Sequence, residues 1–155
     1  MCSNYAYDYV QSTWENIRNF KGGHAIFTQP NTPVKCAGAP QKIMYLAEDH
    51  FRRSGVRDTS HVTFATATGG IFAVKKYADA LNKIVATRDI DTKYKHNLVE
   101  IRAEAKEAFA RHLHEVFALD IELAAETDLA RAGGRGVGMI DRVELLALAL
   151  GIVLD

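Results

Sequence analysis

Residues 1–102 alternate between helical and strand patterns, and this alternation constrains the fold more than any other feature of the chain. Apolar residues recur at the spacing of one helix face in three segments, residues 10–20, 40–54 and 71–84. Between and after them, runs rich in β-branched and aromatic residues predict strands at residues 24–28, 61–66 and 95–102. The order is therefore a helix followed by strand, helix, strand, helix and strand.

This order is typical of an α/β fold, specifically a half-Rossmann βαβαβ parallel sheet with covering helices. The core face of the third helix is expected to be the stripe Ala73, Tyr77, Ala80, Leu81 and Ile84. Ligands of such sheets bind beyond the carboxyl ends of the strands. The loops 29–39 and 67–71 follow strands in this chain, so we expect the functional site there.

The net charge is zero, but the charges are unevenly distributed. Residues 1–102 hold 14 basic and 9 acidic side chains, a balance of +5, whereas residues 103–155 hold 5 and 10, a balance of −5. Alanine-rich and leucine-rich segments at 103–119 and 140–150 have the composition of helices. We therefore expect two units, a Rossmann-like segment over residues 1–102 and a helical, acidic C-terminal tail over residues 103–155.

Composition also argues against several classes of protein. Overall neutrality disfavours an electrostatic nucleic-acid binder, and no apolar run is long enough for a transmembrane segment. Two cysteines and no signal-peptide pattern favour a reduced, soluble intracellular setting. The six histidines show no metal-binding spacing along the sequence, so we expect no metal site.

The loop before the second expected helix carries the strongest candidate site. Cys36 lies just before a helix N-terminus, whose free N–H groups and dipole favour an anion, and Lys35 adds a positive charge. Both features favour the nucleophilic thiolate, and the small residues Ala37 and Gly38 would let a flat cofactor or a persulfide approach the backbone. The alternative is an inert, buried structural cysteine.

A second candidate is Gly69-Gly70, after the strand expected at 61–66. Two glycines between a strand and a helix could cradle a phosphate, although they do not form a GxGxxG fingerprint. The alternative is a tight strand-to-helix turn. Together with Pro33, these glycines are the cofactor-binding residues that we expect.

The run NTPVKCAGAPQKIMYL at residues 31–46 resembles the active-cysteine segment of sulfide:quinone oxidoreductases of the mitochondrial and related bacterial type. The resemblance continues through short runs across residues 2–102, namely CSNY at 2–5, TWENI at 13–17, AIFTQPNTP at 25–33, IFAVKKYADAL at 71–81 and YKHNLVEIR at 94–102. It covers about two thirds of the chain.

The resemblance implies an FAD-dependent flavoprotein with Rossmann-like domains, bound peripherally to the bacterial or mitochondrial inner membrane. Such proteins oxidise sulfide through a cysteine persulfide and pass the electrons through FAD to quinone. Cys36 matches one of the two redox cysteines. The N-terminal FAD fingerprint and the second redox cysteine have no counterpart in this sequence, and Cys2 does not match that partner. The resemblance thus implies a partial oxidoreductase segment, completed by a missing flavoprotein domain or a homo-oligomer.

The tail resembles a different class of protein. Residues 126–129 and 136–146 are similar to an acyl carrier protein, but Gly138 and Met139 stand where that family has its Asp-Ser pair. Without the serine, phosphopantetheine attachment is not expected. The alternative function is therefore a non-catalytic binding or carrier-like module, and a third hypothesis is a fused sequence without activity of its own.

Overall fold

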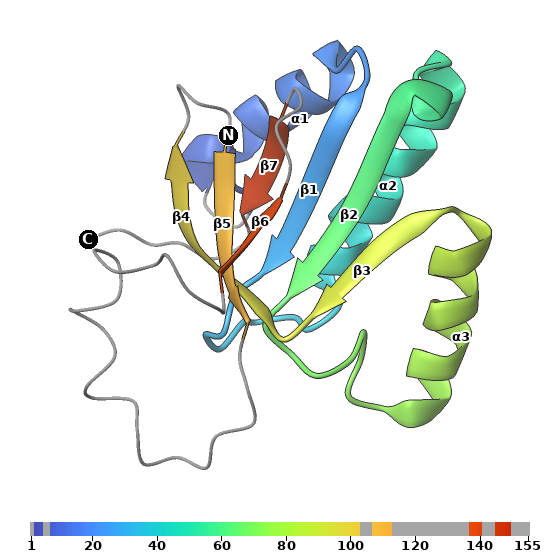
Figure 1. Ribbon diagram of the computed structural model, residues 1–155. Helices are drawn as coiled ribbons and strands as arrows, with labels where there is room; N and C mark the ends of the chain where they lie inside the picture. The colour runs from blue at the N-terminus through green and yellow to red at the C-terminus, as the bar shows by residue number, and fades with distance from the viewer. Residues whose placement is uncertain (1, 5–6, 103–106, 113–136, 141–144, 150–155) are drawn as a thin grey trace.

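The computed structural model describes residues 2–4, 7–102, 107–112, 137–140 and 145–149 (Figure 1). Its helices are α1 (Val10–Asn19), α2 (Ala39–Ser54) and α3 (Lys75–Thr87), with short 3-10 helices η1 (Tyr7–Tyr9) and η2 (Arg57–Thr59). Its strands are β1 (Gly23–Gln29), β2 (Ser60–Thr66), β3 (Ile90–Tyr94), β4 (His96–Arg102), β5 (Glu107–His112), β6 (Val137–Ile140) and β7 (Leu145–Ala149).

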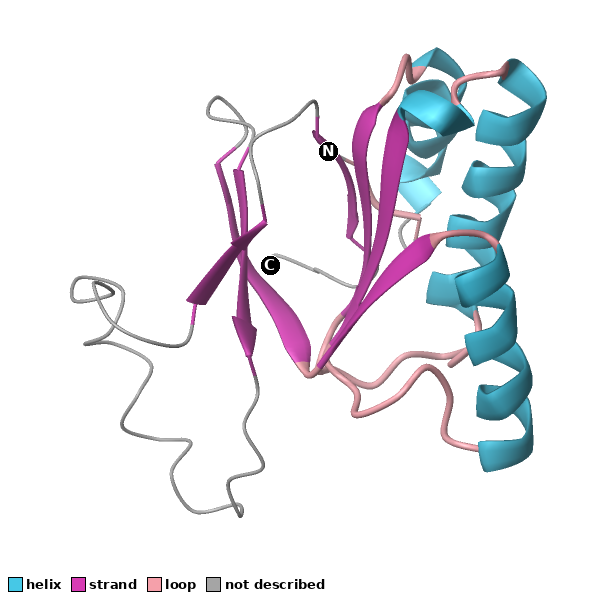
Figure 2. Cartoon of the chain, turned by 45° about the vertical axis from the view of Figure 1, so that its right-hand side comes forward, coloured by secondary structure: helices cyan, strands magenta, loops and turns pink. Residues whose placement is uncertain are grey.

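The strands form two sheets. One is parallel, in the order β3-β2-β1-β7, and the other is antiparallel, in the order β4-β5-β6. The helices cover one face of the parallel sheet, and the antiparallel strands lie on its other side (Figure 2). The predicted α/β class, with its half-Rossmann parallel sheet and covering helices, is confirmed.

The main core lies between the parallel sheet and the helices. Alternate residues of the strands point toward the helices, because successive side chains of a strand project to opposite faces. The fully buried members of this core include Ala25 and Phe27 of β1, Val62 and Phe64 of β2, and Met44, Ala47 and Phe51 of α2. This packing fixes α2 on the sheet and thereby positions the loop from which the helix begins.

The third strand of the parallel sheet was predicted at residues 95–102, but the structure has it at residues 90–94, and the predicted segment is the next strand, β4. The chain enters β3 at Ile90, directly after the left-handed residue Asp89 (φ 53°), and β3 pairs in parallel with β2. Lys95, with a φ of 58°, then separates β3 from β4, which joins the antiparallel sheet. Charged Asp91 and Lys93 interrupt the apolar residues of β3, and this concealed the strand from its composition.

The helical prediction for the tail is wrong wherever the structure describes the tail. Residues 107–112, 137–140 and 145–149 are strands rather than helices. In β5, Ala108 and Ala110 are buried and alternate with half-buried Phe109 and Arg111, which is the period of a strand. Pairing with β4 and β1 overrides the helix propensity of alanine and leucine. The division into two units at residue 103 remains a prediction, and strands on both sides of it pair.

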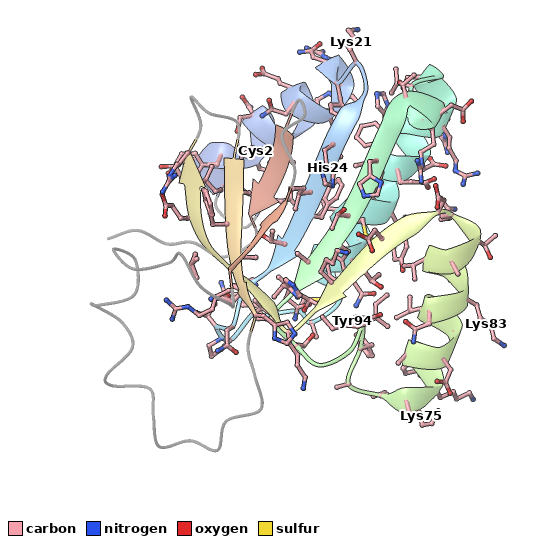
Figure 3. The ribbon with its side chains drawn as sticks, viewed as in Figure 1. Cys2, Lys21, His24, Lys75, Lys83 and Tyr94 are labelled. Carbon is pink, nitrogen blue, oxygen red and sulfur yellow. The ribbon has the colours of Figure 1, made fainter. Side chains whose placement is uncertain are left out.

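The face of α3 that packs on the sheet also differs from the expected one. Val85 is buried and Ala78 and Leu81 pack beside it, whereas Tyr77 and Ile84 are exposed. Lys83 lies on the outer side of this helix, and Lys75 lies at the end where the helix begins (Figure 3). The sequence of α3 has two apolar stripes, and only the stripe with Ala78, Leu81 and Val85 packs against the sheet.

Within the part of the chain that the structure describes, no helix combines the length and apolar character needed to cross a bilayer.

Gly22 occupies a position where any side chain is expected to be costly. Its φ of 111° is unfavourable for residues with a Cβ, and a Cβ there would lie 2.5 Å from Thr59 Oγ1 and 3.0 Å from the Thr59 carbonyl oxygen. We expect Gly22→Ala to lower the free energy of unfolding by about 2 kcal/mol in urea titrations. Gly55→Ala is the control, since Gly55 (φ 77°) has open space around a Cβ. Equal losses for the two variants would contradict the predicted clash.

Candidate functional site

The candidate site lies at the carboxyl edge of the parallel sheet, where the loops after β1 and β2 and the turn after β3 come together. Tyr94 marks this edge at the end of β3, and Cys2 lies far from it toward the other ends of the strands (Figure 3). The position agrees with the general rule that open α/β sheets bind ligands beyond the carboxyl ends of their strands.

Cys36 lies in a turn directly before α2. Ala39 N donates a hydrogen bond of 3.0 Å to Cys36 O, and Lys42 N donates one of 3.0 Å to the carbonyl oxygen of Gly38, the N-cap residue. The thiol side chain is exposed, whereas Cys2 is buried in the main core. The alternative of a buried structural cysteine therefore describes Cys2 and not Cys36.

The loop around Cys36 is tied to its neighbours by hydrogen bonds. Buried Gln41, in the first turn of α2, donates from Nε2 to the carbonyl oxygen of Ile71. Ala67 N donates to Gln29 O at 3.0 Å, and Asn31 N donates to Asn97 Oδ1 at 3.1 Å. These hydrogen bonds join the loops after β1 and β2 to each other and to β4. The loop that carries Cys36 is therefore held in place at the edge of the sheet.

The other site residues expected from the sequence lie at the same edge. Lys35, Ala37 and Pro33 are exposed beside Cys36, and Gly38 is half-buried at the start of α2. Lys42 extends back along the first turn, because its Cε would lie 3.9 Å from a Cβ placed on Gly38. The sequence between residues 16 and 47 contains no acidic side chain, so the loop is a positively charged segment. The roles of these residues remain predictions.

Gly69 and Gly70 do not have the geometry of a turn that holds a dinucleotide cofactor. Gly69 and Gly70 have no left-handed φ, a Cβ on Gly70 would meet nothing within 4 Å, and one on Gly69 would meet only Lys95 Cε, at 3.8 Å. In a dinucleotide-binding turn, glycine is needed because the pyrophosphate lies so close to the backbone that a side chain would collide with it. Neither Gly69 nor Gly70 is so closely surrounded.

The most strongly coupled charges lie away from this edge, around the fully buried carboxylate of Glu48 on α2. It accepts hydrogen bonds from Arg52 and Arg88, and Arg57 Nε lies 3.3 Å from Glu48 Oε1. Burial raises the pKa of Glu48, but the hydrogen bonds and positive charges of Arg52 and Arg88 outweigh it and lower the pKa below its ordinary value.

This charge cluster is structural, since it joins α2 to η2 and to the end of α3. Arg57 also donates to Ser60 O at 2.8 Å and to the carbonyl oxygens of Arg88 and Asp89, both at 2.7 Å. The sequence carried a signal for it: Glu48 falls on the apolar stripe of α2, four residues after Met44 and three before Phe51, where a charge needs a partner.

Curated relatives were found for about two thirds of the chain. It is 57% identical over 106 residues to the mitochondrial sulfide:quinone oxidoreductase of Mus musculus, covering 68% of this chain and 24% of that protein. The enzyme of the same name from Dictyostelium discoideum is 47% identical over 107 residues, with the same coverage. That of Schizosaccharomyces pombe is 41% identical over 113 residues, covering 72% of this chain and 25% of the relative. No protein-family model matches the chain.

Solved structures agree on the fold. The sulfide:quinone oxidoreductase of Aquifex aeolicus superposes with a TM-score of 0.58 at 17% identity, over 72% of this chain and 27% of that one. The water-forming NADH oxidase of Lactobacillus brevis, bound to NADH, gives a TM-score of 0.54 at 7% identity over 97% of this chain and 25% of the oxidase.

The chain spans about a quarter of the length of the curated relatives it matches. The resemblance inferred from the run around Cys36 is confirmed, and the carrier-like alternative gains no support from these similarities. Over about two thirds of its length, this chain is therefore homologous to one segment of the sulfide:quinone oxidoreductases.

Proposed function

We propose that the chain is the cysteine-bearing segment of a sulfide:quinone oxidoreductase and that Cys36 is its sulfur-carrying thiol. The observation that supports this most is the exposed position of Cys36 in the turn before α2, at the carboxyl edge of the sheet. The dipole of α2 and the neighbouring Lys35 place positive charge at this end of the helix, which suits anionic sulfide and polysulfide. The run that resembles the active-cysteine segment of the family surrounds the same residue.

The proposed chemistry separates into sulfur transfer and electron transfer. In sulfur transfer, the Cys36 thiolate attacks the terminal sulfur of a persulfide or polysulfide, a new S–S bond forms, and the shortened donor leaves as a thiolate or hydrosulfide. This step needs no external oxidant. Forming the same persulfide from the thiolate and hydrosulfide releases two electrons, so it requires a two-electron acceptor.

In complete members of the family, FAD and then quinone accept those electrons. The chain spans about a quarter of the length of its relatives, and Gly69 and Gly70 lack the geometry of a dinucleotide-binding turn, so the acceptor in our proposal comes from a flavoprotein partner or domain that completes the segment. Sulfide and quinone are accordingly the proposed substrates of the assembled enzyme. Its proposed location is peripheral to an inner membrane, as the resemblance implies.

Sulfur transfer tests the role of Cys36 directly. Anaerobic treatment of the reduced chain with inorganic polysulfide is expected to add one sulfur atom, located on Cys36 by peptide mass spectrometry. Cys36→Ser should remove the adduct completely, because the nucleophile is gone. Cys2→Ser should retain it, because Cys2 is buried. An adduct located on Cys2, or full uptake by Cys36→Ser, would show that Cys36 is not the sulfur carrier.

A further inference from the structure

The turn between β3 and β4 is hydrogen-bonded to both of the loops that form the carboxyl edge of the parallel sheet (Figure 1). Lys95 N donates a hydrogen bond of 2.9 Å to Thr68 O, in the loop after β2. Asn97 Oδ1 accepts one of 3.1 Å from Asn31 N, at the start of the loop that carries Cys36. The strand β4, which belongs to the antiparallel sheet, therefore contributes a side chain to the proposed site.

This turn has a conformation that its surroundings impose. Lys95 has a φ of 58°, and a residue with a Cβ keeps such a left-handed conformation only where the surrounding structure holds it. His96 Nδ1 donates a hydrogen bond of 2.7 Å to Tyr94 O, and the Tyr94 hydroxyl donates one of 2.9 Å to Asn82 Oδ1 of α3. The side chain of Asn97 therefore starts from a fixed point of the backbone.

The loop that carries Cys36 is held at both of its ends. Asn97 holds the beginning of this loop, and buried Gln41 holds its end by donating from Nε2 to Ile71 O. Between the two lies the turn in which Ala39 N donates to Cys36 O at 3.0 Å. A loop whose two ends are held has fewer backbone conformations available than a loop held at one end. Without the Asn97 side chain, only the end at the helix is held.

We propose that Asn97 is a positioning residue for sulfur transfer to Cys36, because its side chain holds the start of the loop and thereby the turn that presents the thiol. This inference rests on the proposed role of Cys36 as the sulfur carrier. Asn97 takes no part in the bond changes themselves. Its side-chain oxygen accepts from a backbone N–H, so aspartate, which has an oxygen at the same place, can do the same, whereas leucine cannot.

Amide hydrogen exchange followed by NMR tests the positioning without any sulfur chemistry. In Asn97→Leu, the Asn31 amide should lose its protection. The Ala39 amide, which donates to Cys36 O, should exchange about fivefold faster, a factor typical for the loss of one ordinary hydrogen bond. Asn97→Asp should keep the wild-type exchange rates. Val99→Ala, at an exposed position of the same strand, is the control and should leave both amides unchanged.

The rate of sulfur transfer from inorganic polysulfide to Cys36 tests the consequence for function. It is measured in about 1 M NaCl, where the Debye length is about 3 Å, so that the charge of the new aspartate is screened. Asn97→Leu should lose most of the excess of the folded-state rate over the rate in urea, whereas Asn97→Asp should retain this excess. The Tm should change little in either variant, because the hydrogen bond that is altered is exposed.

The outcomes separate this inference from the proposed function. If the wild-type chain formed no sulfur adduct on Cys36, the proposed function would be wrong and this inference would fall with it. If the adduct formed and Asn97→Leu reacted at the wild-type rate, or if its Ala39 amide exchanged at the wild-type rate, only the positioning role would be wrong. Equal losses of rate in the leucine and aspartate variants would also overturn it, because the hydrogen bond would then not be the cause.

Discussion

Replacing Glu48 by glutamine is expected to lower the free energy of unfolding by about 3 kcal/mol, because removing one partner of a buried ionic network leaves its other members without compensation. Glu48 is fully buried and serves Arg52, Arg57 and Arg88, so the substitution disconnects α2 from η2 and from the end of α3. In a chain of this size, a loss of this magnitude lowers Tm by roughly 10 °C, which urea and thermal titrations followed by circular dichroism will resolve.

A matched control separates the buried network from ordinary surface pairs on the same helix. Asp49 pairs with Arg53 at 2.8 Å, and both side chains are exposed, so Asp49→Asn should cost less than about 0.5 kcal/mol. Similar losses of stability in the Glu48 and Asp49 variants would show that the buried network stabilises the fold no more than an exposed ion pair does.

The stabilisation by Glu48 should also depend on pH. The folded-state pKa of Glu48 lies below its ordinary value of 4.5, so the unfolded chain binds its proton more readily. Its stabilising contribution is therefore fully present above about pH 4.5 and is lost as the pH falls through the folded-state pKa. The wild-type chain should lose more stability on acidification than Glu48→Gln does; parallel pH profiles of the two proteins would contradict this assignment.

The second large effect is expected in the core of the parallel sheet, at Phe27. Its ring is fully buried in β1 and faces the helices. Phe27→Ala should lower the free energy of unfolding by about 4 kcal/mol, because it removes apolar burial and leaves a cavity in a packed core. For a domain whose total stability is about 5–15 kcal/mol, such a loss brings the protein close to its unfolding threshold.

Tyr77 is the informative control for Phe27. Its sequence position suggested a core residue, but in the structure 57% of its surface is exposed and its ring contacts Phe72. Tyr77→Ala should therefore cost only about 0.5 kcal/mol. A cost as large as that of Phe27→Ala would show that the exposed stripe of α3 is buried in solution.

The sequence predicted the elements whose patterns are local and missed those that depend on distant partners. α1, α2, β1 and β2 were found from apolar periodicity and β-branched composition, and their bounds agree within a few residues. β3 was missed because charged residues interrupt its apolar positions. β7 was missed because only its pairing with β1, more than a hundred residues earlier, makes a leucine-rich segment extended.

The candidate site was predictable to a similar extent. The position of Cys36 before a helix follows from Pro40, a residue suited to the first helical turn, and the structure places the thiol there. The expectation that Gly69-Gly70 approach a cofactor closely has no counterpart in their backbone geometry. The hydrogen bond between Asn97 and Asn31 could not be predicted from the sequence, because it joins residues that lie far apart along the chain.

In our proposal, the turn before α2 makes Cys36 a sulfur-carrying thiol and does more than expose it. The most direct measurement compares the rate of sulfur transfer from polysulfide to Cys36 with the rate for the double variant Cys36→Ser/Ala37→Cys, in which an exposed thiol is moved by one residue. We expect Cys36 to react faster than the thiol at position 37 in the folded chain, because hydrogen bonds of the loop hold residue 36 at the start of the turn before α2, and we expect urea to remove the difference. Equal rates for the two thiols in the folded chain would contradict it.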